Sequence, residues 1–194
     1  MNDLTREKWD KVYSAQSHQQ AHATQVVAEN IHLLPSAGKG LELACGLANN
    51  SFALAECGIA MEAWDISIVA AERVNQRAAQ TGAQVTASAR DVVIQPPLAA
   101  EYDVVVVSHF LDRTLIPAII TALKPGGLLF YQTFTQTRVS ESGPQNNDWR
   151  LADGELLTLF AALRPLVYRE EGLMGDIRHG LRNEALLVAQ KPPG

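Results

Sequence analysis

The chain has 194 residues, of which 47% are hydrophobic, so one domain can bury a core that is stable without disulfides or a metal. Its formal net charge of −5 argues against nucleic acid as a partner, because a phosphate-binding surface needs clustered Lys and Arg. The apolar runs are strand-length, shorter than the roughly 20 residues of a membrane helix, which argues against a membrane protein.

The amino-terminal part, residues 1–36, is predicted to form a helical lead-in, and residues 38–194 the remainder of a single domain. Val26, Val27 and Ile31 fall roughly on one face of a helix. Apolar segments bounded by glycine and proline then predict strands at residues 41–44, 60–65, 84–89, 103–108 and 128–134. Helices are predicted between them, at residues 49–58, 67–82 and 115–123.

The carboxy-terminal part begins with a long polar loop, residues 137–150. A helix is predicted over residues 154–164 with Asp153 as its N-cap. Two strands follow, at residues 165–171 and 184–191, and their short connection predicts an antiparallel pair. The fold class is therefore α/β: a Rossmann-like, doubly wound, seven-stranded and mostly parallel sheet with an antiparallel carboxy-terminal strand pair and helices on both faces.

A tight turn follows the first strand, and it carries the most informative residues of the chain. Glu42 is the last polar group before this turn, and Gly46 lies within it. Asp65 ends the second strand, where a carboxylate can accept hydrogen bonds from ribose hydroxyls. Asp91 follows the third strand and can accept from the amino group of adenine, while Val92 packs on the ring. An ordinary strand-to-helix turn, an N-cap role for Asp65 and a capping role for Asp91 remain the alternatives.

These residues resemble a known family. The turn, Asp65, Arg90-Asp91 and the segments DVVVVS and LKPGGLL are similar to class I S-adenosylmethionine-dependent methyltransferases over about residues 38–135. The segments ACGLANNSFALA, AWDISIVAAERV and WDKVY resemble the tellurite-resistance-type methyltransferases. Those relatives commonly have Gly-Arg-Asn where this chain has Ala48-Asn49-Asn50, and alanine disfavours the positive φ that glycine permits.

The resemblance implies S-adenosylmethionine as the cofactor. Trp9 and Tyr13 share a helix face, and they are expected either to anchor this helix in the core or, by the resemblance, to cover the cofactor. Cys45 lies in the turn, where packing is its expected role. The expected cofactor-binding residues are Trp9, Tyr13, Glu42, Ala44, Cys45, Gly46, Asn50, Asp65, Ile66, Asp91, Val92 and Ser108.

The acceptor side is expected after the fourth strand and in the last connection. His109 and Arg113 follow that strand, and Arg178, His179 and Arg182 cluster between the last two strands. The four candidate catalytic residues are His109, Arg113, Arg178 and His179. A cationic cluster suits an oxyanion or carboxylate substrate, although these residues can equally be ordinary solvated charges.

No metal site is predicted. His18 and His22 have the spacing of a ligand pair, but no neighbouring carboxylate or cysteine completes a site. Cys45 and Cys57 are too few for a disulfide framework. With a polar amino terminus that does not resemble a signal peptide, these features indicate a cytoplasmic protein.

The expected function is methyl transfer from S-adenosylmethionine to a small-molecule acceptor. A soft or anionic nucleophile, either a thiol or a metalloid oxyanion, needs little acid–base assistance because the donor is already activated. An NAD(P)-dependent oxidoreductase and a non-catalytic cofactor-binding protein are the alternatives. The sequence does not indicate whether the protein is a monomer or an oligomer.

Overall fold

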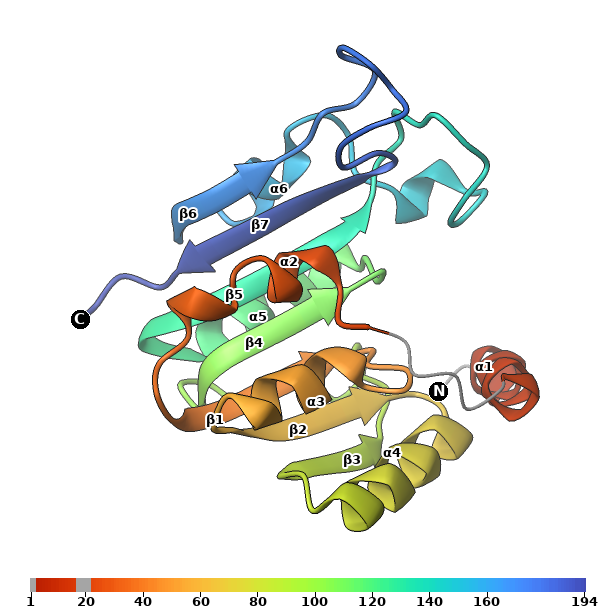
Figure 1. Ribbon diagram of the computed structural model, residues 1–194, viewed down its shortest axis with the longest axis vertical. Coiled ribbons are helices and arrows are strands. Elements are labelled where there is room, and N and C mark those ends of the chain that lie inside the picture. Colours follow the sequence, from red (N-terminus) through yellow and green to blue (C-terminus); the bar gives the residue numbers. More distant parts are fainter. Residues whose placement is uncertain (1–2, 17–21) are drawn as a thin grey trace.

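A seven-stranded sheet with the strand order β3-β2-β1-β4-β5-β7-β6 forms the centre of the protein (Figure 1). The computed structural model describes residues 3–16 and 22–194. The strands are β1 (Gly38–Leu43), β2 (Ile59–Asp65), β3 (Val85–Ala89), β4 (Tyr102–Ser108), β5 (Leu123–Phe134), β6 (Arg164–Arg169) and β7 (Glu184–Gln190). The α-helices are α1 (Asp3–Ala15), α2 (Gln25–Ala28), α3 (Asn49–Glu56), α4 (Ile68–Thr81), α5 (Ile116–Ala122) and α6 (Glu155–Leu159). Three short 3-10 helices are η1 (Ile31–Leu33), η2 (Arg113–Leu115) and η3 (Asn147–Trp149).

Strand direction confirms the predicted fold class. The strands from β1 to β5 pair in parallel, and β7 pairs antiparallel with β6, as the sequence predicts. β7 also lies antiparallel to β5, between β5 and β6. The start of β7 therefore lies at the same edge of the sheet as the carboxyl ends of the parallel strands.

Helices cover both faces of the sheet, as a doubly wound fold requires. Successive valines of β4 point to opposite faces and are all fully buried. Val104 and Val106 pack with residues of α2, α3 and α4, while Val105 and Val107 pack with residues of α5 and α6. β1 and β4 are neighbours, so the chain reverses its winding direction between them. Ligands of open α/β sheets bind at such a switch point, beyond the carboxyl ends of the strands.

The predicted ends of α4 are confirmed by their capping contacts. The Ser67 side chain accepts a hydrogen bond from the Ala70 N–H at 3.1 Å, so Ser67 is the N-cap. At the other end Gly82 has φ +70° and donates its N–H to the Ala78 carbonyl. This left-handed C-cap ends the helix where glycine tolerates the conformation.

Two helical predictions are wrong in extent. Residues 22–36 contain only α2 and η1 rather than one amphipathic helix, and the Val26 N–H in the first turn of α2 donates to the Gln132 side chain of β5 at 2.7 Å. The helix predicted over residues 154–164 ends at Leu159. Its N-cap is Gly154 rather than Asp153, whose carboxylate instead accepts from the Thr137 hydroxyl at 3.0 Å. Within the described parts of the chain, no helix has the length and apolar character to cross a membrane.

Candidate active site

The turn between β1 and α3 follows a path that glycine usually provides. Ala44, Gly46 and Ala48 have φ angles of 51°, 53° and 55°, all in the left-handed region. The two alanines therefore adopt a conformation that glycine tolerates freely, at a cost of roughly 1–2 kcal/mol each. A side chain at Gly46 would also lie 2.8 Å from the Tyr13 hydroxyl. The turn thus follows a left-handed path with alanine at two of these three positions.

Asp65 at the end of β2 holds this turn in place. Its Oδ2 accepts from the Gly46 N–H at 2.8 Å, and its Oδ1 accepts from the Ser67 N–H at 2.9 Å. The side chain is buried, and burial raises the pKa of Asp65, although these backbone N–H groups oppose the rise. The carboxylate thus connects the turn after β1 to the start of α4.

Glu42 is a buried carboxylate at the end of β1. Its Oε1 accepts from the Asn50 side chain at 2.8 Å, and its Oε2 accepts from the Ser51 N–H and hydroxyl at 2.9 and 2.6 Å. Burial raises the pKa of Glu42 to about 7, even though these hydrogen bonds favour the ionised form. Glu42 therefore fixes the first turn of α3 to the sheet.

Asn50 joins three parts of the carboxyl edge. Its Nδ2 donates to Glu42 and, at 3.0 Å, to the Ser108 hydroxyl at the end of β4. Its Oδ1 accepts from the N–H and hydroxyl of Thr24 at 2.8 and 2.9 Å. These four bonds fill the hydrogen-bonding capacity of the amide. Asn50 thereby fixes the spacing between β1 and β4 at the switch point.

Asp91 lies after β3, at the same edge. Its Oδ1 accepts from the N–H groups of Val93 and Ile94 at 3.1 and 3.3 Å, which are the contacts of a capping residue. Val92 is buried, whereas Ile66 is partly buried. Arg90 stacks on the Trp64 ring at 3.9 Å, and its buried Nε has no hydrogen-bond partner within the described chain.

The amino-terminal helix α1 lies over this turn (Figure 1). Asp10 accepts from the Ser67 hydroxyl at 2.5 Å, and Tyr13 lies against Gly46. Burial and the nearby Asp65 raise the pKa of Tyr13. Trp9 stacks on Tyr13 with ring centroids 5.8 Å apart, but α1 contains no fully buried residue. The expectation that Trp9 and Tyr13 anchor α1 in the core is therefore wrong.

Cys45 is buried in the core cluster that α3 and α4 cover, as expected from a packing role. Cys45 and Cys57 are both free. Of the two histidines with ligand spacing, His18 lies outside the described residues.

His109 directly follows β4 in a left-handed conformation, with φ 54°. Its ring lies 5.0 Å from the Phe134 ring, and its Nε2 lies 3.2 Å from Glu184 Oε2. Gln132 Nε2 donates to the same carboxylate oxygen at 2.6 Å. Burial alone would raise the pKa of Glu184, but the contacts with His109 and Gln132 hold that pKa below its usual value. The result is an oriented imidazole beside an ionised carboxylate at the switch-point edge.

Sequence reasoning found His109 but missed Glu184 and Gln132. Glu184 is the first residue of β7, and Gln132 lies near the end of β5. The detectable signal was the same as for Asp65, a polar residue at one end of an apolar strand. Because β7 runs antiparallel, its first residue rather than its last lies at the carboxyl edge.

Arg113 holds the surrounding loops together. Its guanidinium forms a bidentate pair with Glu155 at 2.6 and 2.9 Å. It also donates to the carbonyls of Asp148 and Arg150 at 2.6 and 3.0 Å. These bonds correspond to a structural role between α6 and the preceding loop.

The three cationic residues of the last connection do not form an open anion site. Arg178 forms a bidentate pair with Asp176 at 2.9 and 2.8 Å, and the side chains of Arg178 and His179 are each 82% exposed. Arg182 is partly buried and donates to the carbonyls of His179 and Gly172 at 2.6 and 2.7 Å.

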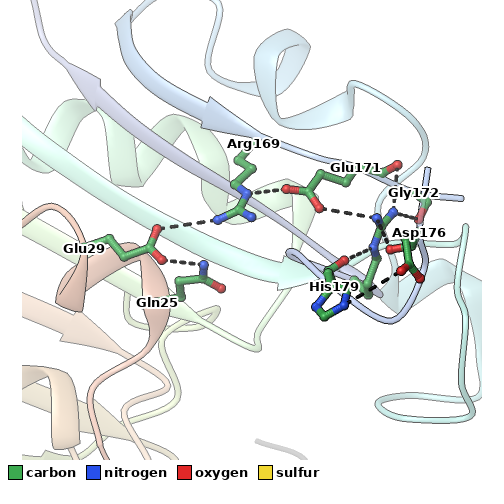
Figure 2. Close-up of polar contacts among 8 residues, drawn as sticks. Gln25, Glu29, Arg169, Glu171, Gly172, Asp176 and His179 are labelled. Carbon is green, nitrogen blue, oxygen red and sulfur yellow. Dashed lines mark hydrogen bonds and ion pairs between the residues drawn. The ribbon is translucent and has the colours of Figure 1, made fainter. Parts of the chain in front are cut away.

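A chain of charges connects this segment to α2. Figure 2 shows Arg169 between Glu29 and Glu171, with contacts of 3.7 and 2.5 Å. Glu171 in turn lies 3.7 Å from Arg182. The positive charges of this chain are therefore paired with carboxylates, and the prediction of an anion site there is not supported by the geometry.

The sequence comparison identifies the family. Residues 15–164 match the family described as a methyltransferase domain, which is more than half of the chain. The protein therefore belongs to the methyltransferase domain family. No curated protein sequence matches the chain significantly.

Solved structures share the fold over nearly the whole chain. TehB from Haemophilus influenzae has a TM-score of 0.72 at 20% identity, covering 94% of this chain and 67% of TehB. Geranyl diphosphate C-methyltransferase from Streptomyces coelicolor A3(2) has a TM-score of 0.72 at 14% identity, covering 96% and 97%. A structure concerned with the conversion of a disulfide bond into a thioacetal group during echinomycin biosynthesis has a TM-score of 0.73 at 19% identity, covering 97% and 92%.

The residues at the switch point fit S-adenosylmethionine, the methyl donor that the sequence resemblance implies. The left-handed Gly46 has no side chain that would block approach to the turn, and Asp65 and Asp91 provide carboxylate acceptors at the ends of neighbouring strands. Carboxylates at these positions match the hydroxyl and amino donors of an adenosine.

Proposed function

We propose that this methyltransferase transfers a methyl group to a small-molecule thiol. In this proposal Asp65 binds the ribose and Asp91 the adenine edge, with Ile66 and Val92 as apolar neighbours. Gly46 and Ala44 leave room at the turn, while Glu42, Asn50 and Ser108 keep its shape and Tyr13 covers it. When bound, S-adenosylmethionine supplies a methyl carbon on a positively charged sulfur.

The pair of His109 and Glu184 is the observation that carries the acceptor proposal. If the Nε2 proton of His109 points to Glu184, Nδ1 has a free lone pair. His109 is 41% exposed, so an acceptor can reach it. Nδ1 takes the proton of the thiol, and Glu184 stabilises the resulting imidazolium. The thiolate then forms its bond to the methyl carbon as the carbon–sulfonium bond breaks.

The comparisons support sulfur as the acceptor atom and are compatible with a second acceptor class. One similar structure concerns a disulfide bond, and TehB fits the resemblance to tellurite-resistance-type methyltransferases. A metalloid oxyanion is therefore the second candidate acceptor. It carries no proton that must be removed before attack, so its methylation would not need His109.

The decisive experiment follows S-adenosylhomocysteine formation across pH with simple thiols, selenite and tellurite. We expect His109→Gln to lower kcat for thiols by roughly 10²–10⁴-fold near pH 7. The defect should shrink above about pH 8.5, where a thiol ionises without help. Glu184→Gln should show the same trend with a smaller loss.

Calorimetric titration with S-adenosylhomocysteine is the control, because neither substitution should alter cofactor affinity. Wild-type protein that methylates none of the thiols would refute the thiol proposal. A His109→Gln variant with an unchanged pH profile would remove His109 as the base.

A further inference from the structure

Arg138 and Arg150 form a pair of cations near the carboxyl edge of the sheet, and among the described residues no carboxylate forms an ion pair with either. Arg150 is fully buried, and it donates to the carbonyls of Pro144 and Thr135 at 2.6 and 2.8 Å and to the Ser142 carbonyl. Burial lowers the pKa of Arg150, and the positive charge of Arg138 lowers it further. The two guanidinium groups are therefore close enough to repel each other.

Arg138 has unused hydrogen-bonding capacity. Its Nη1 is buried and has no hydrogen-bond partner anywhere in residues 3–16 and 22–194. A buried donor on a charged group is costly to leave unpaired. Glu141 attracts Arg150, but it is exposed and no ion pair joins it to either arginine in the part of the chain that the structure describes. An incoming anion would remove this cost.

The backbone around Arg138 is held rigidly. Asn183 Oδ1 accepts from the N–H groups of Val139 and Ser140 at 2.6 and 3.2 Å, directly after Arg138. On the other side the Thr137 hydroxyl donates to Asp153 and the Thr137 carbonyl accepts from Thr135. A rigid backbone reduces the entropy lost when a side chain binds a ligand.

Arg150 of this cationic pair lies near the proposed base. The Arg150 guanidinium is 5.4 Å from the centre of the Phe134 ring, and the His109 ring is 5.0 Å from the same ring. His109 and Arg150 therefore both lie near the Phe134 ring. A small acceptor with its nucleophile at His109 would extend toward this side of the sheet edge.

We propose that Arg138 binds an oxyanion group of the methyl acceptor, with Arg150 reinforcing the positive potential beneath it. This inference rests on the proposed function and narrows it to small thiols that carry a carboxylate, sulfonate or phosphate. A guanidinium suits this role because its planar set of donors matches oxyanion geometry. In this proposal Arg138 is the source of anion selectivity, in place of Arg178, His179 and Arg182, which the sequence analysis considered for that role.

The test compares thiols of similar size but different charge. Mercaptoacetate, 2-mercaptoethanesulfonate and 2-mercaptoethyl phosphate carry an anion, 2-mercaptoethanol is neutral, and cysteamine is cationic. We expect lower KM values for the anionic thiols, and Arg138→Gln should raise those values at least about tenfold. The KM for 2-mercaptoethanol should stay within about twofold, and Arg138→Lys should restore part of the loss. The ranking among the three anions would identify the oxyanion preferred.

Arg164→Gln is the matched control, because it removes an equal charge from an exposed position. Arg164 is the first residue of β6 and lies at the edge of the sheet away from the carboxyl ends of the parallel strands. A binding measurement that needs no turnover accompanies the kinetics. Titration of mercaptoacetate and inorganic phosphate into the protein with S-adenosylhomocysteine should show weaker binding to Arg138→Gln than to Arg164→Gln.

Equal binding of these anions to both variants would overturn the role of Arg138, even if thiols are methylated. Conversely, selective anion binding without methylation of any thiol would uphold Arg138 and refute the thiol proposal.

Discussion

The N–H of Gly46 donates to Asp65 Oδ2 at 2.8 Å, so the end of β2 holds the turn that follows β1. The Asp65 carboxylate therefore stabilises the turn and, in the proposed function, also binds the ribose. Effects on folding and on cofactor binding must be measured separately at this position.

Asp65→Ala should weaken S-adenosylhomocysteine binding at least about tenfold, because a hydrogen bond to a charged group contributes roughly 1.5–3 kcal/mol. The variant should also lose stability, since the N–H groups of Gly46 and Ser67 lose their acceptor. Calorimetric titration measures the first effect and urea unfolding the second. Asp91→Ala is the comparison and should lose less affinity, because adenine also gains apolar contact. An Asp65→Ala protein that is folded and binds with wild-type affinity would disprove the ribose assignment.

Ala44→Gly should raise the free energy of unfolding by about 0.5–1 kcal/mol, because Ala44 has φ 51° and glycine adopts this conformation without strain. Gly46→Ala should do the opposite, since its φ is 53° and its new methyl group would meet the Tyr13 hydroxyl. Urea unfolding of both variants checks the pair. A loss of stability in Ala44→Gly would show that the methyl group contributes more by packing than it costs in backbone strain.

Glu42 should make folding stability fall as pH rises. Its pKa is about 7 in the folded protein, against 4.5 as the ordinary value, so the unfolded chain loses this proton first. Between pH 4.5 and 7 the folded state therefore binds more protons, and stability declines with increasing pH. The full difference is on the order of 3 kcal/mol and is reached above pH 7.

The Glu42→Gln variant isolates this effect, because glutamine does not titrate. Urea unfolding at pH 5, 6, 7 and 8 should show wild type losing stability relative to the variant across this range. A constant difference between the two proteins at all four pH values would mean that Glu42 stays ionised in the folded protein.

Arg150→Gln should lower the free energy of unfolding by at least about 2 kcal/mol, because it leaves buried carbonyls without a donor. Arg164→Gln, at an exposed position, should stay within about 0.5 kcal/mol of wild type. Chemical unfolding of the two variants measures the difference. Equal stabilities would show that water replaces the guanidinium at no cost.

The sequence predicts the sheet well because its strands are apolar runs bounded by glycine, proline or polar residues. It predicts residues 22–36 poorly, because this segment is positioned by contacts with residues distant in the sequence, such as that of Val26 with Gln132. Local periodicity contains no information about such a contact.

The candidate site likewise contains residues that the sequence predicts and residues that it does not. Glu42 and Asp65 could be found from the sequence, because each is a polar residue that ends an apolar strand at the edge where ligands bind. Glu184 carries the same signal, but assigning it to this edge also requires the direction of β7 and its place beside β5. Arg138 lies in a polar loop, where the sequence does not distinguish a paired cation from an unpaired one.

The position of β7 between β5 and β6 also orders the events of biosynthesis. The ribosome delivers β6 before β7, yet β6 pairs only with β7 within the described sheet. Until β7 emerges, β6 has no neighbouring strand and the edge of β5 on that side remains unpaired. Nascent chains paused before Glu184 should consequently attract chaperones that bind exposed apolar segments. The His109 imidazole gains its carboxylate partner only when this late strand inserts, so the pair assembles last during synthesis.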